Sequence, residues 1–323
     1  MRHDLSLDFG MSFCRDKIPG HGEDSYCYSF CDNAGMLGAF DGCGGAGARK
    51  HDYYTGHTEA YMASRLCAGS FYDQFRRLFP CDTPAAELAK KVFAPQTVQR
   101  LIDFAPPRSE NGLQIKGSSV RTLPTTAAAA FMQRGRDGSV LVTAVWAGDS
   151  RVYIMDSKGL AQLTVDDTTV ADPMISIYED GVLKNLFSSD KPVELHCSTI
   201  KMTEPFVVFA ATDGCFGYLS TPMEFEGVLL KTLLQTKCAA DWEKELDRVL
   251  GSAAGDDYTL CLAAYGFGSY AALQRYYAER YGFIEKKYLH PVSALPIEER
   301  ESRYALWSSY RDDYMRYIKG GRA

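Results

Sequence analysis

The sequence predicts an α+β protein whose core is one sheet packed on another, with helices on the outside. The order along the chain is strands, two helices, many strands, two helices and a last strand. Strands and helices that alternated singly would instead indicate a parallel sheet. A chain of 323 residues, 46% hydrophobic and 24% charged, is also long enough and apolar enough to fill a large core.

The first strands are expected to form a hairpin with acidic ends. Residues 4–13 alternate apolar and polar side chains, as a half-buried strand does. Residues 25–31 are strand-like and aromatic, and a turn at 32–35 leads to a second strand at 36–40. This hairpin places Glu23–Asp24 and Asp41 at the same edge of a sheet.

The remaining elements follow from periodicity and from proline and glycine breaks. Helices are expected at 57–79 and from 83–84 to about 105, the second with a break at Pro95. Residues 108–123 and 157–192 read as loops or irregular structure. The other expected elements are strands within 125–134 and 139–156 and at 193–200, 205–211 and 258–265, and helices at 222–236 and 239–252.

The composition changes near residue 267. Residues 268–323 contain nine of the twenty tyrosines and no cysteine. We therefore expect a main domain at 1–266 and a tyrosine-rich helical extension at 267–323, with helices at 270–285 and 297–318 separated by breaks at His290–Pro291 and Leu295–Pro296. The extension either packs on the main domain, with Tyr276, Tyr277, Tyr281 and Phe283 as buried anchors, or forms a docking surface for a partner.

Charge and composition exclude several classes of protein. The net charge of −6 lacks the basic excess of a generic nucleic-acid binder. No run approaches the roughly 18 apolar residues of a membrane span, and the N-terminus has no apolar signal-like region. The ten cysteines form no C-x-x-C pair, which indicates free thiols in a reducing compartment. We expect a cytoplasmic protein that binds neither nucleic acid nor a membrane.

Acidic turns are the strongest functional signal. They lie at Glu23–Asp24, in DGCGG (41–45), in GDSR (148–151), in TDG (212–214) and in DDYT (256–259). Carboxylate and carbonyl oxygens suit Mg²⁺, Mn²⁺ or Ca²⁺, whereas the histidine spacing does not suit zinc. Any single D-G dipeptide is more simply a turn. Several such turns at strand ends instead indicate one metal site, in which a carboxylate could bridge two ions.

These motifs, in this order, resemble the type 2C metal-dependent Ser/Thr protein phosphatases, the PPM family. The resemblance covers roughly residues 5–266. Besides the acidic turns, it includes TTAAAA (125–130), LTVDD (163–167) and GVLKNLF (181–187). It implies a four-layer α-β-β-α sandwich, in which two packed antiparallel sheets are flanked by helix pairs. The implied activity is hydrolysis of phosphoserine or phosphothreonine by direct attack of a metal-bridging water, with two Mn²⁺ or Mg²⁺ ions and a third, weaker one.

The resemblance also assigns roles to residues. Asp41 corresponds to the carboxylate that bridges both metals, and Gly42 supplies a backbone carbonyl. The other implied metal ligands, directly or through water, are Glu23, Asp24, Asp149, Asp213 and Asp256. We expect Asp41, Asp24 and Cys43 to take part in catalysis. The implied partners are a phosphoprotein substrate and a cognate Ser/Thr kinase, and we expect a monomer.

Three positions depart from the family pattern. Cys43 replaces a histidine proposed as general acid, and a neutral thiol is a weaker donor near pH 7. Pro19 replaces an arginine that binds the substrate phosphate, so Arg15 and Lys17 are the nearest substitutes. Asp257 stands where asparagine is usual and adds a negative charge. The alternative to an active phosphatase is therefore a catalytically weak binding or scaffolding module.

Overall fold

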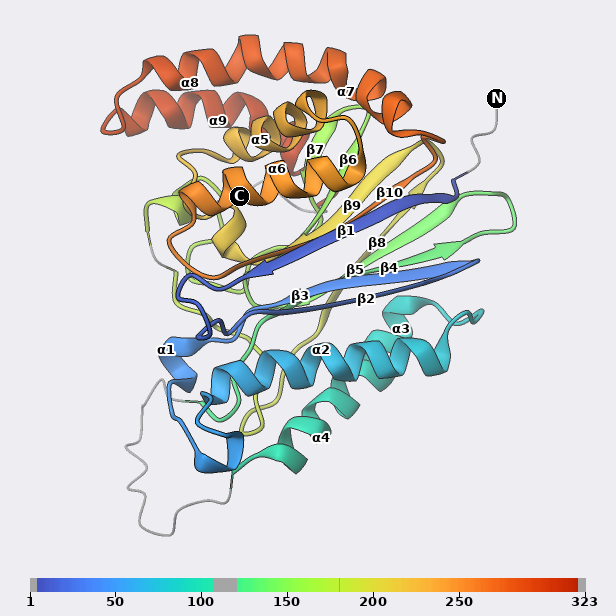
Figure 1. Cartoon of the computed structure of the whole chain (residues 1–323), viewed down its shortest axis with the longest axis vertical. Coiled ribbons are helices and arrows are strands. Elements are labelled where there is room, and N and C mark those ends of the chain that lie inside the picture. The colour runs from blue at the N-terminus through green and yellow to red at the C-terminus, as the bar shows by residue number, and fades with distance from the viewer. Residues whose placement is uncertain (1–4, 107–120, 180, 319–323) are drawn as a thin grey trace.

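Two five-stranded antiparallel sheets lie face to face in the computed structural model, which describes residues 5–106, 121–179 and 181–318 (Figure 1). The first sheet has the order β1-β10-β9-β6-β7, with strands β1 (Leu7–Arg15), β10 (Tyr258–Tyr265), β9 (Phe206–Ala211), β6 (Arg151–Asp156) and β7 (Gly159–Gln162). The second has the order β2-β3-β4-β5-β8, with strands β2 (Ser25–Cys31), β3 (Ala34–Phe40), β4 (Ala127–Arg134), β5 (Val140–Ala147) and β8 (His196–Met202).

Helices cover the outer face of each sheet, so the predicted four-layer α-β-β-α sandwich is confirmed (Figure 1). On the second sheet lie α2 (Glu59–Leu78), α3 (Ala85–Leu88) and α4 (Ala94–Phe104). On the first sheet lie α5 (Pro222–Gln235), α6 (Ala239–Ala253), α7 (Tyr270–Ile284), α8 (His290–Ala294) and α9 (Arg300–Tyr314). Shorter elements are α1 (Gly44–Gly47) and 3-10 helices at Asp52–Tyr54, Ile175–Ile177 and Asp213–Cys215. No helix among the described residues is long and apolar enough to cross a membrane.

Strand β3 shows how the layers are held together. All seven of its residues are buried. Met36 and Phe40 belong to the apolar cluster formed with the α2–α4 helices, whereas Leu37 and Ala39 belong to the cluster between the two sheets. Successive side chains of a strand point to opposite faces, so one continuous apolar run serves both layers. The end of β3, where Asp41 follows, is therefore fixed on both sides.

The expected interruptions near Pro95 and Pro291 are π-helical turns rather than loops. Pro95 and Pro291 lie at the second positions of α4 and α8, and each follows a π-helical turn, at Ala89–Phe93 and Glu285–Leu289. Proline lacks the backbone N–H of an interior helical bond, but it is tolerated in a first turn, where that donor has no helical partner. The π-helical turn starts a new helical segment at each proline, so the helical path continues without a loop.

The C-terminal helices share one apolar cluster with the first sheet. Tyr277 and Trp307 are fully buried in the cluster that includes the α5 and α6 side chains. Tyr276 and Tyr281 are partly buried against it. The expectation that Phe283 is a buried anchor was wrong, since it is 45% exposed. Its ring instead faces outward, and the charged ends of Arg280 and Lys287 lie over it.

Candidate metal centre

The β2–β3 hairpin brings the first acidic residues together. Ser25 pairs with Phe40, so Asp24, just before β2, and Asp41, just after β3, leave the sheet at the same edge. The backbone of Asp41 is fixed by Thr125 and Thr126, because its N–H donates to Thr126 Oγ1 (3.3 Å) and its carbonyl accepts from Thr125 Oγ1 (2.7 Å). This agrees with the predicted arrangement of the hairpin.

The first sheet supplies the other carboxylates at the same end of the sandwich. Asp149 lies in the turn between β5 and β6, Asp213 follows β9, and Asp256 precedes β10. Ala211 pairs with both Arg151 and Leu260, which aligns these three strand ends. Burial, reinforced by the charges of Asp24, Asp213, Asp149 and Asp256, raises the pKa of Asp41 well above its usual value. The five aspartates thus lie close enough to repel one another.

Burial and mutual repulsion also oppose ionisation of the other acids. Burial raises the pKa of Asp24 and of Asp149 to about 8, with Asp213 contributing to both. Burial and the charge of Asp256 raise the pKa of Asp213 to about 6. The pKa of Glu23 is raised as well, mainly by burial. A bound cation would reverse this balance, because an opposite charge nearby favours the ionised form.

Neutral hydroxyl groups support the carboxylates from behind. Thr212 Oγ1 donates to Asp24 Oδ2 (2.8 Å), and Thr58 donates to Glu23 Oε1. Thr126 Oγ1 and Ser150 Oγ share a hydrogen bond of 2.6 Å. No role was predicted for these hydroxyls, although Thr126 and Ser150 lie in the TTAAAA and GDSR motifs.

The donor set fits a hard divalent cation. Asp149 Oδ1 is buried with no hydrogen-bond partner. The available ligands are carboxylate and carbonyl oxygens, which Mg²⁺ and Mn²⁺ prefer. The arrangement is open, since no group of three or more His, Cys, Asp or Glu side chains among the described residues is already arranged to hold an ion. A bound cation would therefore have to draw these carboxylates closer together.

Cys43 lies at the edge of this cluster. Burial raises the pKa of its thiol well above the usual value, and the charges of Asp41 and Asp149 add to the effect. The group is therefore a neutral thiol at pH 7, so it does not offer a thiolate nucleophile.

Asp257 has a structural role that its sequence position did not reveal. Its Oδ1 accepts the backbone N–H of Lys17 and its Oδ2 accepts that of Glu23, both at 2.7 Å. Both oxygens of a carboxylate accept hydrogen bonds, whereas an asparagine would present an NH₂ group to one of these donors. The aspartate therefore fixes the 17–23 loop to the start of β10.

The two cations suggested for substrate phosphate, Arg15 at the end of β1 and Lys17 in the following loop, have partners on α6 and at its C-terminus. Arg15 donates to Asp247 Oδ2 from Nε (3.0 Å) and Nη2 (2.8 Å). Lys17 Nζ donates to the carbonyl of Ala254 at 2.5 Å. Their role in phosphate binding stays a prediction. Arg65, for which no role was predicted, places its Cζ 3.4 Å from the centroid of the Tyr61 ring and donates from Nη2 to the carbonyl of Gly22.

Two cavities in the described part of the chain lie away from the acidic cluster. One of about 390 Å³ is at the opposite end of the sandwich and is lined by residues such as Phe30, Gly35 and Tyr265. The other, of about 400 Å³, lies between Met174–Glu179 and α9. Neither is lined by any of the five aspartates.

Gly42 has no room for a side chain. A Cβ atom there would lie 2.5 Å from the carbonyl oxygen of Ala60 and 2.7 Å from that of Glu23. Backbone atoms cannot move aside cheaply, so Gly42→Ala is expected to lower the stability by about 1–3 kcal/mol and to displace the Gly42 carbonyl. Urea unfolding would measure the loss. Gly45→Ala is the matched control, because a Cβ at Gly45 has nothing within 4 Å. Equal stability of the two variants would contradict the prediction.

No protein-family model matches the sequence. No curated protein matches it significantly either. Solved structures do match. The Ser/Thr phosphatase Stp1 from Staphylococcus aureus is 17% identical, with a TM-score of 0.58 over 82% of this chain and 97% of that one. The Mycobacterium tuberculosis phosphatase PstP/Ppp is 17% identical, with a TM-score of 0.54 over 80% of this chain and 99% of that one.

A further match has a bound metal. The catalytic domain of the phosphatase PstP in complex with two manganese ions is 16% identical, with a TM-score of 0.53 over 81% of this chain and 99% of that one. The chain therefore has the fold of the PPM-type Ser/Thr phosphatases.

Proposed function

We propose that the chain is a metal-dependent protein phosphatase that hydrolyses phosphoserine and phosphothreonine. The observation that carries the proposal is the convergence of five aspartates, from both sheets, on one edge of a fold shared with such phosphatases. A cluster of acids that costs stability is hard to explain without a cation to neutralise it. Two Mn²⁺ or Mg²⁺ ions are the proposed cofactors.

The proposed roles are those that the resemblance to the PPM phosphatases implies. Asp41, whose carboxyl group interacts with the other four aspartates, would hold both ions, together with the Gly42 carbonyl, Asp213 and Asp256. Glu23 and Asp24 would hold the surrounding waters through hydrogen bonds, and Asp149 would hold a third, weaker ion. When bound, such ions polarise phosphoryl oxygens and increase the acidity of water.

The chain's own groups limit the chemistry further. The neutral Cys43 thiol favours attack by water over a covalent phospho-enzyme. Because a thiol of raised pKa is a weak proton donor, protonation of the leaving group falls to a water or another residue. The finer parts of the proposal are that the chain is a cytoplasmic monomer and that its substrates are the phosphoproteins of a cognate Ser/Thr kinase.

Turnover by the full chain is the decisive test. We expect phosphate release from p-nitrophenyl phosphate and from a phosphothreonine peptide with Mn²⁺, and none with EDTA. Asp213→Asn is expected to reduce the rate by more than about 100-fold, because it removes a direct ligand. Asp137→Asn is the matched control, since Asp137 is an exposed aspartate in the β4–β5 turn and pairs with Lys201 on β8.

The outcomes separate two functions. Hydrolysis that depends on Asp213 and on metal supports the phosphatase. Binding of a phosphopeptide without hydrolysis at any metal concentration would instead support the scaffolding module, which the substitutions at Cys43 and Pro19 favour. Equal rates for Asp213→Asn and Asp137→Asn would overturn the assigned site.

A further inference from the structure

A buried arginine begins β6, immediately after the turn that contains Asp149. Arg151 follows Asp149 by two residues, and its side chain is 4% exposed. Its guanidinium donates to both oxygens of Asp166, from Nε at 3.0 and 3.1 Å and from Nη2 at 2.6 Å. Arg151 is the first residue of β6 and pairs with Ala211, the last residue of β9, so it lies two residues from Asp149 and joins the strand ends that carry Asp149 and Asp213. The position of Arg151 therefore influences where these two proposed ligands lie.

The first contact between α9 and Arg151 runs through two tyrosines. Tyr314, on α9, is 1% exposed and donates its hydroxyl to that of Tyr153 at 3.2 Å. The same Tyr153 hydroxyl accepts a hydrogen bond from Arg151 Nη1 at 3.3 Å. A residue of the C-terminal helix is thus one hydroxyl group away from the guanidinium.

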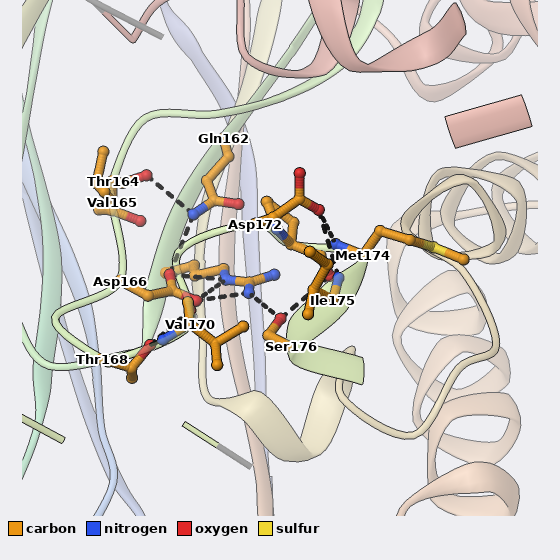
Figure 2. A network of polar contacts seen from close by, with 12 residues as sticks. Gln162, Thr164, Val165, Asp166, Thr168, Val170, Asp172, Met174, Ile175 and Ser176 are labelled. Atoms are coloured by element: carbon orange, nitrogen blue, oxygen red, sulfur yellow. Dashed lines mark hydrogen bonds and ion pairs between the residues drawn. The ribbon is translucent and has the colours of Figure 1, made fainter. Parts of the chain in front are cut away.

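The second contact runs through residues 166–176. Asp172 Oδ1 accepts the backbone N–H groups of Met174 and Ile175, which fixes the turn that precedes Ser176 (Figure 2). Asp172 Oδ2 lies 3.4 Å from Trp307 Nε1 and 3.7 Å from Arg311 Nε, both on α9.

This segment returns to Arg151. Asp166 and Ser176 point toward one another in Figure 2, and Ser176 Oγ accepts from Arg151 Nη2 at 3.3 Å. The α9 helix therefore reaches the same guanidinium by two separate sets of contacts.

We propose that helix α9 positions Arg151, and through it Asp149 and Asp213, so that the C-terminal helices tune how tightly the acidic site binds a divalent cation. The inference rests on the proposed function, because it concerns the affinity of that site. Tyr314 and Asp172 act as positioning residues. The C-terminal helices would then affect metal affinity as well as stability.

The test compares two buried tyrosines of the C-terminal helices that each lose one hydroxyl group. Tyr314→Phe removes the bond to Tyr153, whereas Tyr288→Phe removes a bond to the carbonyl of Ser309 on α9 and removes no bond to Tyr153 or Arg151. Mn²⁺ affinity is measured by calorimetry on the full chain without substrate. We expect Tyr314→Phe to weaken binding by about threefold to tenfold, the worth of one hydrogen bond, and Tyr288→Phe to leave it unchanged.

A second readout needs no metal. Amide hydrogen exchange across residues 147–151 in EDTA is expected to speed up in Tyr314→Phe and to match wild type in Tyr288→Phe, because Tyr314, unlike Tyr288, bonds to Tyr153, which holds the arginine beside this turn. Asp172→Asn tests the second set of contacts in the same way and serves if Tyr314→Phe does not fold. Asp137→Asn is its control.

The two proposals fail in different ways. Unchanged Mn²⁺ affinity and unchanged exchange at 147–151 in both Tyr314→Phe and Asp172→Asn would overturn the role of α9 and leave the phosphatase untouched. A wild-type chain that binds no Mn²⁺ would overturn the metal-dependent function, while the exchange experiment would still decide whether α9 restrains Arg151. Equal effects of Tyr314→Phe and Tyr288→Phe would mean that α9 stabilises the fold by packing and does not position Arg151.

Discussion

The metal-free chain is expected to lose about 3 kcal/mol or more of stability between about pH 4 and pH 8. Asp24 and Asp149 have pKa values raised to about 8, first by burial. A carboxyl whose pKa is higher in the folded chain stabilises folding fully below its unfolded pKa and loses that contribution as pH rises to the folded value. For these two groups the loss extends from about pH 4 to about pH 8. Thermal or urea unfolding in EDTA would measure it.

Saturating Mn²⁺ is expected to remove most of this pH dependence. A cation among the carboxylates favours their ionised forms, and a ligand that binds only the folded state raises its stability by mass action. Asp149→Asn is expected to be less sensitive to pH than wild type in EDTA, because one repelling group is gone. Asp137→Asn should follow wild type, since Lys201 and Ser139 lower the pKa of that exposed carboxyl and place its titration below this range. A flat stability profile in EDTA would contradict the expectation.

Local sequence patterns explain which parts of the site could be predicted. Asp41 and Asp24 were placed correctly because a two-residue repeat and a short turn determine where both ends of a hairpin lie. Strand β7 was missed because its four residues, GLAQ, are too few to show a period. Its place in the sheet comes from pairing with β6, which the sequence does not display.

Side-chain partners were harder to predict than backbone elements. Arg15 was considered for phosphate because it is close in sequence to the acidic pair, yet it ends β1 and pairs with Asp247, which lies 232 residues away in sequence. Arg65 was missed because its helix is far from the acidic pair in sequence, although its charge acts on Glu23. Motif spacing cannot predict contacts between residues that are far apart in sequence, whereas folding of the sandwich brings such residues together.

Removing the guanidinium of Arg280 is expected to cost about 3–5 kcal/mol of stability, the usual effect of leaving a buried charge without its partner. Glu226, on α5, is fully buried, and Arg280 on α7 donates to it from Nε (2.7 Å) and Nη2 (3.0 Å). Tyr310 on α9 donates its hydroxyl to the same carboxylate. The pair therefore joins the C-terminal helices to α5, and Arg280→Met keeps most of the apolar volume while leaving Glu226 unpaired.

Two further variants separate charge from packing in this prediction. Adding Glu226→Met to Arg280→Met should restore part of the stability, because a buried ion pair can be replaced by apolar side chains at little cost. Arg248→Met, which breaks the exposed pair with Glu245 on α6, should have no measurable effect. Deleting residues 268–323 should be worse than any of these, because it also uncovers the apolar surface that Tyr277 and Trp307 bury. If the truncated chain stays folded and soluble, the C-terminal helices are a dispensable docking unit, and if it precipitates or unfolds, they belong to the core.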